Sequence, residues 1–360
     1  MSNHEHHDHH RPYESLKPIL LAILAAVLYG ISSPVSKLLL VEIPPALMAA
    51  LLYLGAGLGM LAVSTVNAIR KKEQVEAKMT RKELPYIIGM ILLDIGAPIF
   101  LMLGLTLTTS SNASLLNNFE IVATSVIALF IFKEAIGKRL WIAIAFITLS
   151  SIILSVKDFS SFTFSIGSIF IIMACLCWGF ENNCTRMLSL KDPLQIVVVK
   201  GFGSGIGALI ISIFMKESCN NVLYIFIALL LGFVAYGLSI FFYIKAQRDL
   251  GAARTSAYYA ASPFIGVLIS WVVLKEGITG SFVVALGLML IGTYFAITED
   301  HQHEHLHVEE THEHKHNHND GHHNHVHDFD VVSDHTHVHK HEKQDHKHGH
   351  LPDLHHRHAH

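Results

Sequence analysis

Long apolar stretches alternate with short polar joins over most of this chain. A membrane-spanning helix needs about 20 mostly apolar residues to cross roughly 30 Å of hydrocarbon. Segments of that kind follow one another between residues 18 and 297, and the short joins predict antiparallel neighbours in one bundle. The ten predicted spans are residues 18–41, 45–69, 84–106, 109–132, 139–156, 166–188, 194–215, 222–246, 254–274 and 278–297.

The Lys and Arg residues near the ends of these segments are unevenly distributed. If the N-terminus lies inside, 16 of them fall on the inner side and four on the outer side, namely Lys37, Lys157, Lys216 and Lys275. Positively charged loops tend to stay in the cytoplasm. We therefore expect an integral, multi-pass protein of the cell or inner membrane with both tails in the cytoplasm.

Three short patterns recur in the two halves of the apolar part. Because each half holds five spans and five is odd, the second copy must enter the membrane upside down. The predicted fold is an all-α membrane protein of ten transmembrane helices in two inverted five-helix repeats, flanked by disordered tails. Leu28-Tyr29-Gly30 corresponds to Cys177-Trp178-Gly179 at an offset of 149 residues. The glycine triplet Gly55, Gly57, Gly59 corresponds to Gly203, Gly205, Gly207 at an offset of 148. Phe132-Lys133-Glu134 corresponds to Leu274-Lys275-Glu276 at an offset of 142.

The tails differ from the apolar part in composition. All 28 histidines lie outside residues 11–300. From Glu299 onward the chain has 13 acidic and five basic residues, whereas the rest has 16 acidic and 21 basic residues. The predicted organisation is a histidine-rich tail at 1–17, a first repeat at 18–157, a second repeat at 158–298 and a histidine-rich tail at 299–360.

The paired patterns carry a family resemblance. An inverted five-plus-five repeat, an aromatic residue before Gly30 and Gly179, and a Lys-Glu pair at the ends of helices four and nine resemble the EamA family of the drug/metabolite transporter superfamily. The resemblance covers residues 18–297. It implies a proton- or gradient-coupled carrier, typically an exporter of amino acids, nucleobase-like metabolites or drugs. The chain departs from the family pattern at Tyr29, where tryptophan is more usual, and in its tails, so the fold transfers and the substrate does not.

Four ionisable residues lie well inside predicted spans: Asp94, Glu120, Glu181 and Lys200. Such groups are costly in hydrocarbon and usually face a cavity or a partner. A carboxylate there can take up a proton or hold a cationic substrate, so these residues are candidates for substrate binding or ion coupling. The competing interpretation is a structural ion pair, such as Lys200 with Glu181.

Two amides extend this candidate set. Asn117 lies in helix four near Glu120, and Asn182 follows Glu181 in helix six. Amides in membrane helices hydrogen-bond either a substrate or a neighbouring helix. Helices four and six are therefore the predicted wall of the substrate cavity.

Helix six also offers a possible metal site. Cys177, Glu181 and Cys184 are spaced i, i+4 and i+7, which places two thiols and a carboxylate on one helix face. Thiolates bind soft divalent metals, although a buried cysteine more often behaves as a small hydrophobe.

The repeated glycines and the Lys-Glu pairs have structural interpretations. Small residues four apart let helix backbones approach closely, and their repetition predicts packing within the chain rather than between chains. Lys275 and Glu276 are interpreted as charges that end helix nine.

The C-terminal tail has the composition of a metal-binding segment. Alternating histidines with interspersed acids provide many imidazole and carboxylate sets for zinc, nickel, cobalt or copper, and low hydrophobicity predicts disorder in the absence of metal. Acids between the histidines argue against a purification tag. The predicted collective ligands are His301, His303, His305, His307, His312, His314, His316, His318, His335, His337 and His339.

Three hypotheses for function follow. The first is a secondary transporter that exports a small polar metabolite by alternating access, with metal-binding tails. The second is a divalent transition-metal transporter on the same scaffold, and the third is a membrane-anchored metal store or sensor. No nucleotide-binding loop or hydrolase motif occurs, so we expect no enzyme activity, no required cofactor and no nucleic-acid partner; the expected partners are the lipid bilayer and a small-molecule or ion substrate.

Overall fold

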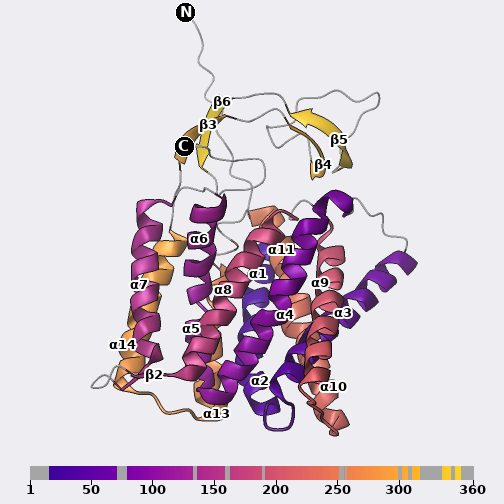
Figure 1. Cartoon of the computed structure of the whole chain (residues 1–360). Coiled ribbons are helices and arrows are strands. Elements are labelled where there is room, and N and C mark those ends of the chain that lie inside the picture. The colour runs from indigo at the N-terminus through magenta and orange to yellow at the C-terminus, as the bar shows by residue number, and fades with distance from the viewer. Residues whose placement is uncertain are drawn as a thin grey trace, which may run out of the picture.

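The apolar segments form helices that lie side by side in one bundle (Figure 1). The structure is a computed structural model. It describes residues 16–70, 79–132, 136–158, 163–188, 191–250, 255 and 258–298, and in the tail residues 302–306, 310–316, 335–341 and 345–349.

Nine of the ten predicted spans are long apolar helices in the part of the chain that the structure describes. The remaining one, residues 254–274, contains the shorter apolar helix α13 (Ser262–Leu274), and most residues between 251 and 257 lie outside the described set. The all-helical membrane fold is thus confirmed. The first half consists of α1 (Leu16–Gly30), α2 (Ser32–Leu39), α3 (Pro45–Ile69), η1 (Arg81–Glu83), α4 (Leu84–Leu107), α5 (Ser110–Leu116), α6 (Phe119–Phe132) and α7 (Lys138–Ser155).

The second half begins with a short antiparallel ribbon of two strands. In the eighth span, the π-helix η2 continues α10 and leads into α11 without a break. Its elements are β1 (Val156–Asp158), β2 (Thr163–Phe164), α8 (Ile166–Arg186), α9 (Pro193–Phe214), α10 (Val222–Leu231), η2 (Gly232–Leu238), α11 (Ser239–Leu250), α13 (Ser262–Leu274) and α14 (Gly280–Ile297).

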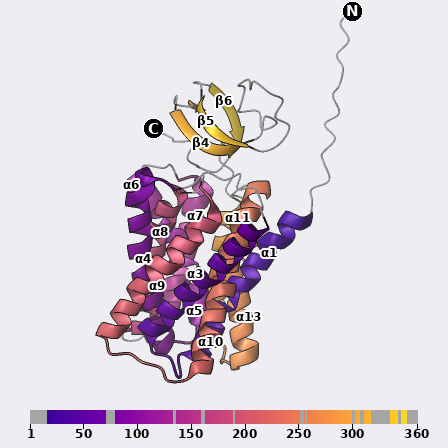
Figure 2. The same cartoon turned by 90° about the vertical axis from the view of Figure 1, so that its right-hand side faces the viewer.

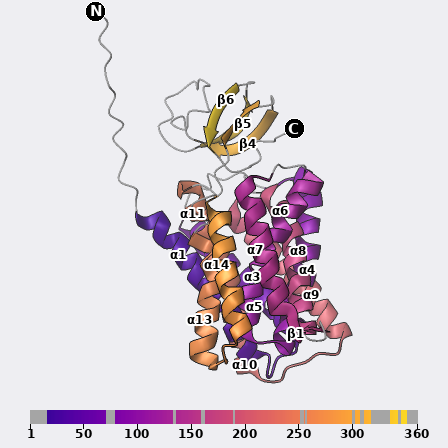
Figure 3. The same ribbon diagram turned by 90° about the vertical axis from the view of Figure 1, so that its left-hand side faces the viewer.

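The packing of the helices follows the inverted repeat. The second span of each half, α3 and α9, pack together, and so do the fifth spans, α7 and α14. Figure 2 shows α3 beside α9, and Figure 3 shows α7 beside α14. The third span of one half packs on the first span of the other, as α4 on α8 and α11 on α1. A pseudo-two-fold relation between two repeats produces this pattern.

Repeated glycines make the central contacts between halves. A Cβ on Gly55 would lie 2.0 Å from the carbonyl oxygen of Leu229, and a Cβ on Gly201 would lie 2.5 Å from the backbone nitrogen of Gly57. Only glycine permits backbones to approach this closely. The prediction that the first glycine triplet packs within the chain is confirmed.

Two spans are interrupted where polar or helix-breaking residues occur. The fourth span breaks at Asn117–Asn118 between α5 and α6, where Glu120 N donates to the Asn117 carbonyl in a tight turn. The first span breaks at Ile31, three residues before Pro34. Both breaks lie between two helical halves of one span, so they place irregular backbone inside the bundle.

Charged side chains tie helix termini together at one end of the bundle, here called the lower end after its place in Figure 1. Glu276 accepts hydrogen bonds from Ser110 N at 2.7 Å, Ser111 N at 2.8 Å and Ser111 Oγ at 2.6 Å. Glu217 accepts one from Leu47 N at 2.7 Å. These carboxylates cap the N-termini of α5 and α3, a role that the interpretation of Glu276 as a helix-ending charge did not include.

The C-terminal tail contains four strands, where the sequence predicts no regular structure. Antiparallel β3 (Gln302–Leu306) and β6 (Asp345–Gly349) pair with each other, as do β4 (Glu310–His316) and β5 (His335–His341). Hydrogen bonds between backbones need no buried core, so low hydrophobicity alone does not exclude such ribbons. The N-terminal tail before Leu16 lies outside the described residues.

Candidate functional site

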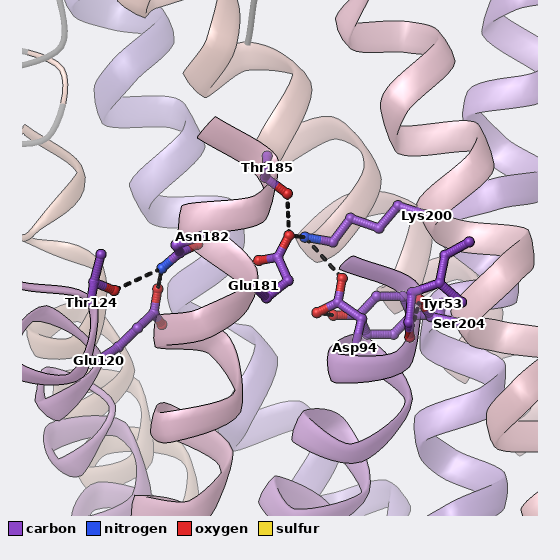
Figure 4. Close-up of polar contacts among 10 residues, drawn as sticks. Tyr53, Asp94, Glu120, Thr124, Glu181, Asn182, Thr185, Lys200 and Ser204 are labelled. Atoms are coloured by element: carbon purple, nitrogen blue, oxygen red, sulfur yellow. Dashed lines mark hydrogen bonds and ion pairs between the residues drawn. The ribbon is translucent and has the colours of Figure 1, made fainter. Parts of the chain in front are cut away.

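A buried charge cluster joins three helices in the middle of the bundle. Lys200 of α9 places its ammonium 3.0 Å from Oδ2 of Asp94 in α4 and 2.9 Å from Oε1 of Glu181 in α8 (Figure 4). Asp94 is fully buried, and Glu181 and Lys200 are 2% and 9% exposed. One ammonium therefore bridges two carboxylates that no longer contact water.

Two neutral side chains donate hydrogen bonds to the carboxylates of this cluster. Tyr53 in α3 donates its hydroxyl to Oδ1 of Asp94 at 3.0 Å, and Thr185, one turn beyond Glu181 in α8, donates to Oε1 of Glu181. Buried charges are tolerated only when they are paired and hydrogen-bonded. Residues from four helices provide this pairing, and the one exception among the described contacts is Oδ2 of Asp94, which has the ion pair with Lys200 but no hydrogen-bond partner.

Glu120 forms a second polar group on the other side of α8. Its Oε1 accepts a 2.6 Å hydrogen bond from Nδ2 of Asn182, which also donates to Oγ1 of Thr124 at 3.2 Å. Figure 4 shows Glu181 directed toward Lys200 and Asn182 directed toward Glu120. Adjacent residues of one helix point about 100° apart, so α8 separates the two groups.

Five tyrosines form a continuous row of ring contacts beside these groups. Ring centroids are 5.4 Å apart for Tyr53 and Tyr236, 5.8 Å for Tyr236 and Tyr29, 5.8 Å for Tyr29 and Tyr259, and 4.9 Å for Tyr259 and Tyr243. The row begins at the partner of Asp94, crosses from α3 through η2 and α1 to Tyr259 before α13, and ends at Tyr243 in α11. It links the charge cluster to helices of both halves.

The repeat gives this cluster a neutral counterpart. Glu181 lies 149 residues after Ser32, and Asp94 lies 142 residues before Tyr236, which are the offsets of the repeated motifs. Ser32 and Tyr236 are themselves joined by a 3.1 Å hydrogen bond from the serine hydroxyl. Leu52 stands where the repeat places Lys200, at an offset of 148. Each of these pairs joins the two halves of the fold, and the pair is charged between α4 and α8 but neutral between α2 and η2.

The structure brings together some of the predicted site residues and separates others. Asp94, Glu181 and Lys200 meet, and Glu120 meets Asn182. Asn117 is buried at the break in the fourth span, and its Oδ1 has no hydrogen-bond partner among the described residues.

The thiols of Cys177 and Cys184 in α8 face α4 instead of a ligand set. A Cβ on Gly89 would lie 3.1 Å from Sγ of Cys184, and one on Gly96 would lie 3.9 Å from Sγ of Cys177. Glu181, the predicted third ligand, is engaged by Lys200. Across the residues whose side chains are described, no three His, Cys, Asp or Glu residues form a group that can hold a metal ion. The side chains of the tail histidines lie outside that set.

Sequence reasoning missed the tyrosines. Tyr29, Tyr53 and Tyr236 lie inside spans, whereas tyrosine in membrane proteins is enriched at the two interfaces with water. The position of these tyrosines inside the spans was therefore a signal in the sequence that they have a polar role in the interior of the bundle. The partners of Asp94 had no comparable signal, because they come from other helices.

Comparison with known proteins identifies the scaffold. The model of the EamA-like transporter family matches residues 16–156 and again residues 165–298. The chain belongs to this family. The two matches also agree with the two-repeat architecture, and the drug/metabolite transporter superfamily follows from the family.

Relatives of this EamA-like protein are described as transporters. It is 26% identical over 270 residues to an uncharacterized transporter of Methanothermobacter thermautotrophicus, covering 71% of this chain and 78% of that protein. It is 23% identical over 229 residues to the uncharacterized transporter YyaM of Bacillus subtilis, covering 59% of this chain and 74% of that one. One crystal structure of a protein matches this chain with a TM-score of 0.55 at 15% sequence identity. The match covers 78% of this chain and 96% of the other chain, and it shows the same fold.

These similarities establish a membrane-embedded transporter of the EamA type. A family of transporters points away from an enzyme, and the fold positions the charge cluster where its repeats meet. Neither relative's description specifies a substrate.

Proposed function

We propose that this protein is a secondary transporter that exports a small polar metabolite by alternating access. The observation that carries the proposal is the Lys200 bridge between Asp94 and Glu181, which joins helices of both repeats in the middle of the bundle. In transporters built from inverted repeats, substrate and coupling-ion sites lie near the midplane between the repeats. A bridge that connects the two halves there is suited to changing its partners when the halves move.

Within this proposal the buried acids have distinct roles. Asp94 and Glu181 compete for one ammonium, so protonating either carboxylate frees Lys200 to favour the other, which couples a proton to the packing of α4, α8 and α9. Glu120 and Asn182 lie on the other side of α8 and serve the substrate. Both tails and the loops with most Lys and Arg are proposed to be cytoplasmic, which makes the lower end of the bundle the outer end.

Flux into proteoliposomes tests the proposal. Purified protein is reconstituted, and uptake of labelled amino acids, nucleobases and amines is followed with and without a proton gradient. We expect gradient-dependent flux of at least one solute, which is lost in Glu181→Gln and Lys200→Met and retained in Glu42→Gln, an exposed acid outside the bundle centre. Flux that persists in both cluster variants would refute the role of the bridge.

Metal transport is the alternative that the same assay decides. If zinc, nickel or cobalt crosses the membrane and Glu181→Gln stops it, the divalent metal is the substrate. The arrangement of the described side chains favours the polar solute, because Lys200 occupies the space between the two acids that a metal cation would need.

Metal binding by the tail is a second proposed function, supported by strand register. His312, His314 and His316 of β4 are directly paired with His339, His337 and His335 of β5. The backbone register therefore sets histidine opposite histidine at three successive pairs, and imidazole is a common ligand of divalent transition metals. Equilibrium dialysis with zinc should therefore give a stoichiometry that falls when the three β5 histidines are replaced by asparagine.

A further inference from the structure

We infer that the solute carried by this protein, or the part of it that binds at the centre, is an organic cation such as a protonated amine, held between the Glu120 carboxylate and the face of Tyr29. The inference rests on the proposed transport function and deepens it by assigning a charge class to the substrate. It depends on the distribution of charge and on polar atoms that lack a partner.

The first observation is the charge balance of the bundle centre. Asp94, Glu120 and Glu181 face a single cation, Lys200, among the described ionisable residues in the middle of the spans. Lys200 is already shared by Asp94 and Glu181 at 3.0 Å and 2.9 Å. An anionic substrate, or the carboxylate of an amino acid, thus finds no uncommitted positive charge in this part of the described structure.

The second observation is the state of Glu120. Among the residues whose side chains are described, only Asn182 donates to it, and it donates to Oε1. No described cation forms an ion pair with Glu120. Its Oε2 is therefore open to a donor that the described side chains do not supply, and a positively charged donor forms the stronger hydrogen bond.

The third observation is the aromatic surface near this carboxylate. Glu120 lies within electrostatic range of Tyr29 and Tyr259, whose rings are 5.8 Å apart and inclined by 34°. Both rings are only partly buried, and the Tyr29 hydroxyl forms no hydrogen bond with any described residue. Tyrosine faces attract cations, and more strongly when water is excluded.

These three observations select one class of ligand. An ammonium donates to Oε2 of Glu120 and lies over the Tyr29 face, and its organic part packs on the row of tyrosines. A neutral polar solute would gain the hydrogen bond without the charge. For a bare metal ion, the described residues provide no group of three His, Cys, Asp or Glu side chains around Glu120.

A charge series on one carbon frame tests the inference. Binding of phenethylamine, 3-phenylpropanoate and phenylalanine to the full-length protein in nanodiscs is measured by equilibrium dialysis. The three compounds share a phenylethyl unit and carry a cation, an anion and a zwitterion. We expect the amine to bind about tenfold more tightly than either of the others.

Substitutions localise the effect. Glu120→Gln and Tyr29→Leu should each weaken amine binding by about tenfold, whereas Tyr29→Phe, which keeps the ring, should retain most of it. Glu42→Gln is the matched control for loss of one negative charge at an exposed position. Size-exclusion profiles identify any variant that fails to fold, and the Tyr29→Phe and Tyr29→Leu pair keeps the test valid if Glu120→Gln is one of them.

The outcomes separate this inference from the proposed function. Preferred binding of the anion or zwitterion, amine binding unaffected by both Glu120→Gln and Tyr29→Leu, or no saturable amine binding at millimolar concentration overturns the inference. If the anion or the zwitterion binds preferentially and also enters proteoliposomes, the inference fails but the proposed transport function stands. Amine binding with the expected variant effects but without flux of any solute supports the site and refutes transport.

Discussion

The ammonium of Lys200 lies 3.0 Å from the carboxylate of Asp94, although the two residues are in opposite repeats of the fold. Together with the 2.9 Å contact to Glu181, this makes Lys200 a bridge between α4, α8 and α9. A charge in this position is held by its partners rather than by water, which determines how the cluster responds to substitution.

Removing the bridge should destabilise the protein more than removing the whole cluster. Lys200→Met leaves two buried carboxylates without a counter-ion, and breaking a buried pair in this way costs about 3–5 kcal/mol. The triple variant Asp94→Asn, Glu181→Gln, Lys200→Met should recover most of that loss. Thermal inactivation of the purified protein in detergent measures both. A triple variant as unstable as Lys200→Met would contradict the pairing.

Two tyrosine hydroxyls offer a matched comparison between the charged cluster and its neutral counterpart. Tyr53→Phe removes a donor to Asp94, and Tyr236→Phe removes the acceptor of Ser32. Hydrogen bonds to charged groups contribute about 1.5–3 kcal/mol and neutral ones about 0.5–1.5 kcal/mol. Tyr53→Phe should therefore lower both thermal stability and solute flux more than Tyr236→Phe does. The reverse order would place the functional polar group at the Ser32–Tyr236 contact instead.

Close backbone contact should make Gly55 intolerant of even one added methyl group. A Cβ there would lie 2.0 Å from the Leu229 carbonyl oxygen, so Gly55→Ala must push α3 away from α10. Gly287 in α14 has no atom within 4 Å of its Cβ position, and Gly287→Ala should be neutral or stabilising by about 0.5–1 kcal/mol. Expression level and melting temperature of the two variants provide the comparison; equal effects would mean that the α3 contact can relax.

The Glu276 cap should keep the lower end of the bundle closed. Its three hydrogen bonds attach the loop after α13 to the first turn of α5 in the other repeat. Opening that end during transport requires their loss. Glu276→Gln weakens them by removing the charge and should shift the population toward the open form by about 1–2 kcal/mol.

Labelling reports that shift. A cysteine at Asn112, in the first turn of α5, should react about five- to thirtyfold faster with an impermeant maleimide in Glu276→Gln than in the parent with the same added cysteine. Glu42→Gln, at the same end of the bundle, should leave the rate unchanged. No acceleration would mean that the cap does not limit opening.

The sequence allowed most of the architecture to be predicted because hydrophobic length and repetition are local properties. Nine of the ten spans appear as long helices in the described chain, and the family match supports the two repeats. The break at Asn117–Asn118 was not predicted, although two adjacent asparagines, which favour turns and caps over helix interiors, were a signal of it in the sequence. The register of the tail strands likewise depends on pairing between distant segments, which composition does not encode.

By itself, the sequence determined that three acids and one lysine lie inside apolar spans, since this requires only hydropathy and position. Spacing also fixed which residues share a face of one helix, because the helical period is constant. Only the tertiary structure decided that Lys200 reaches Asp94 as well as Glu181 and that Asn182 engages Glu120 across 62 residues of sequence. It also decided that two thiols of α8, those of Cys177 and Cys184, lie against α4. The choice of neighbouring helices depends on glycine contacts and on the two-fold packing of the repeats. Both are interactions between segments that are far apart in the sequence.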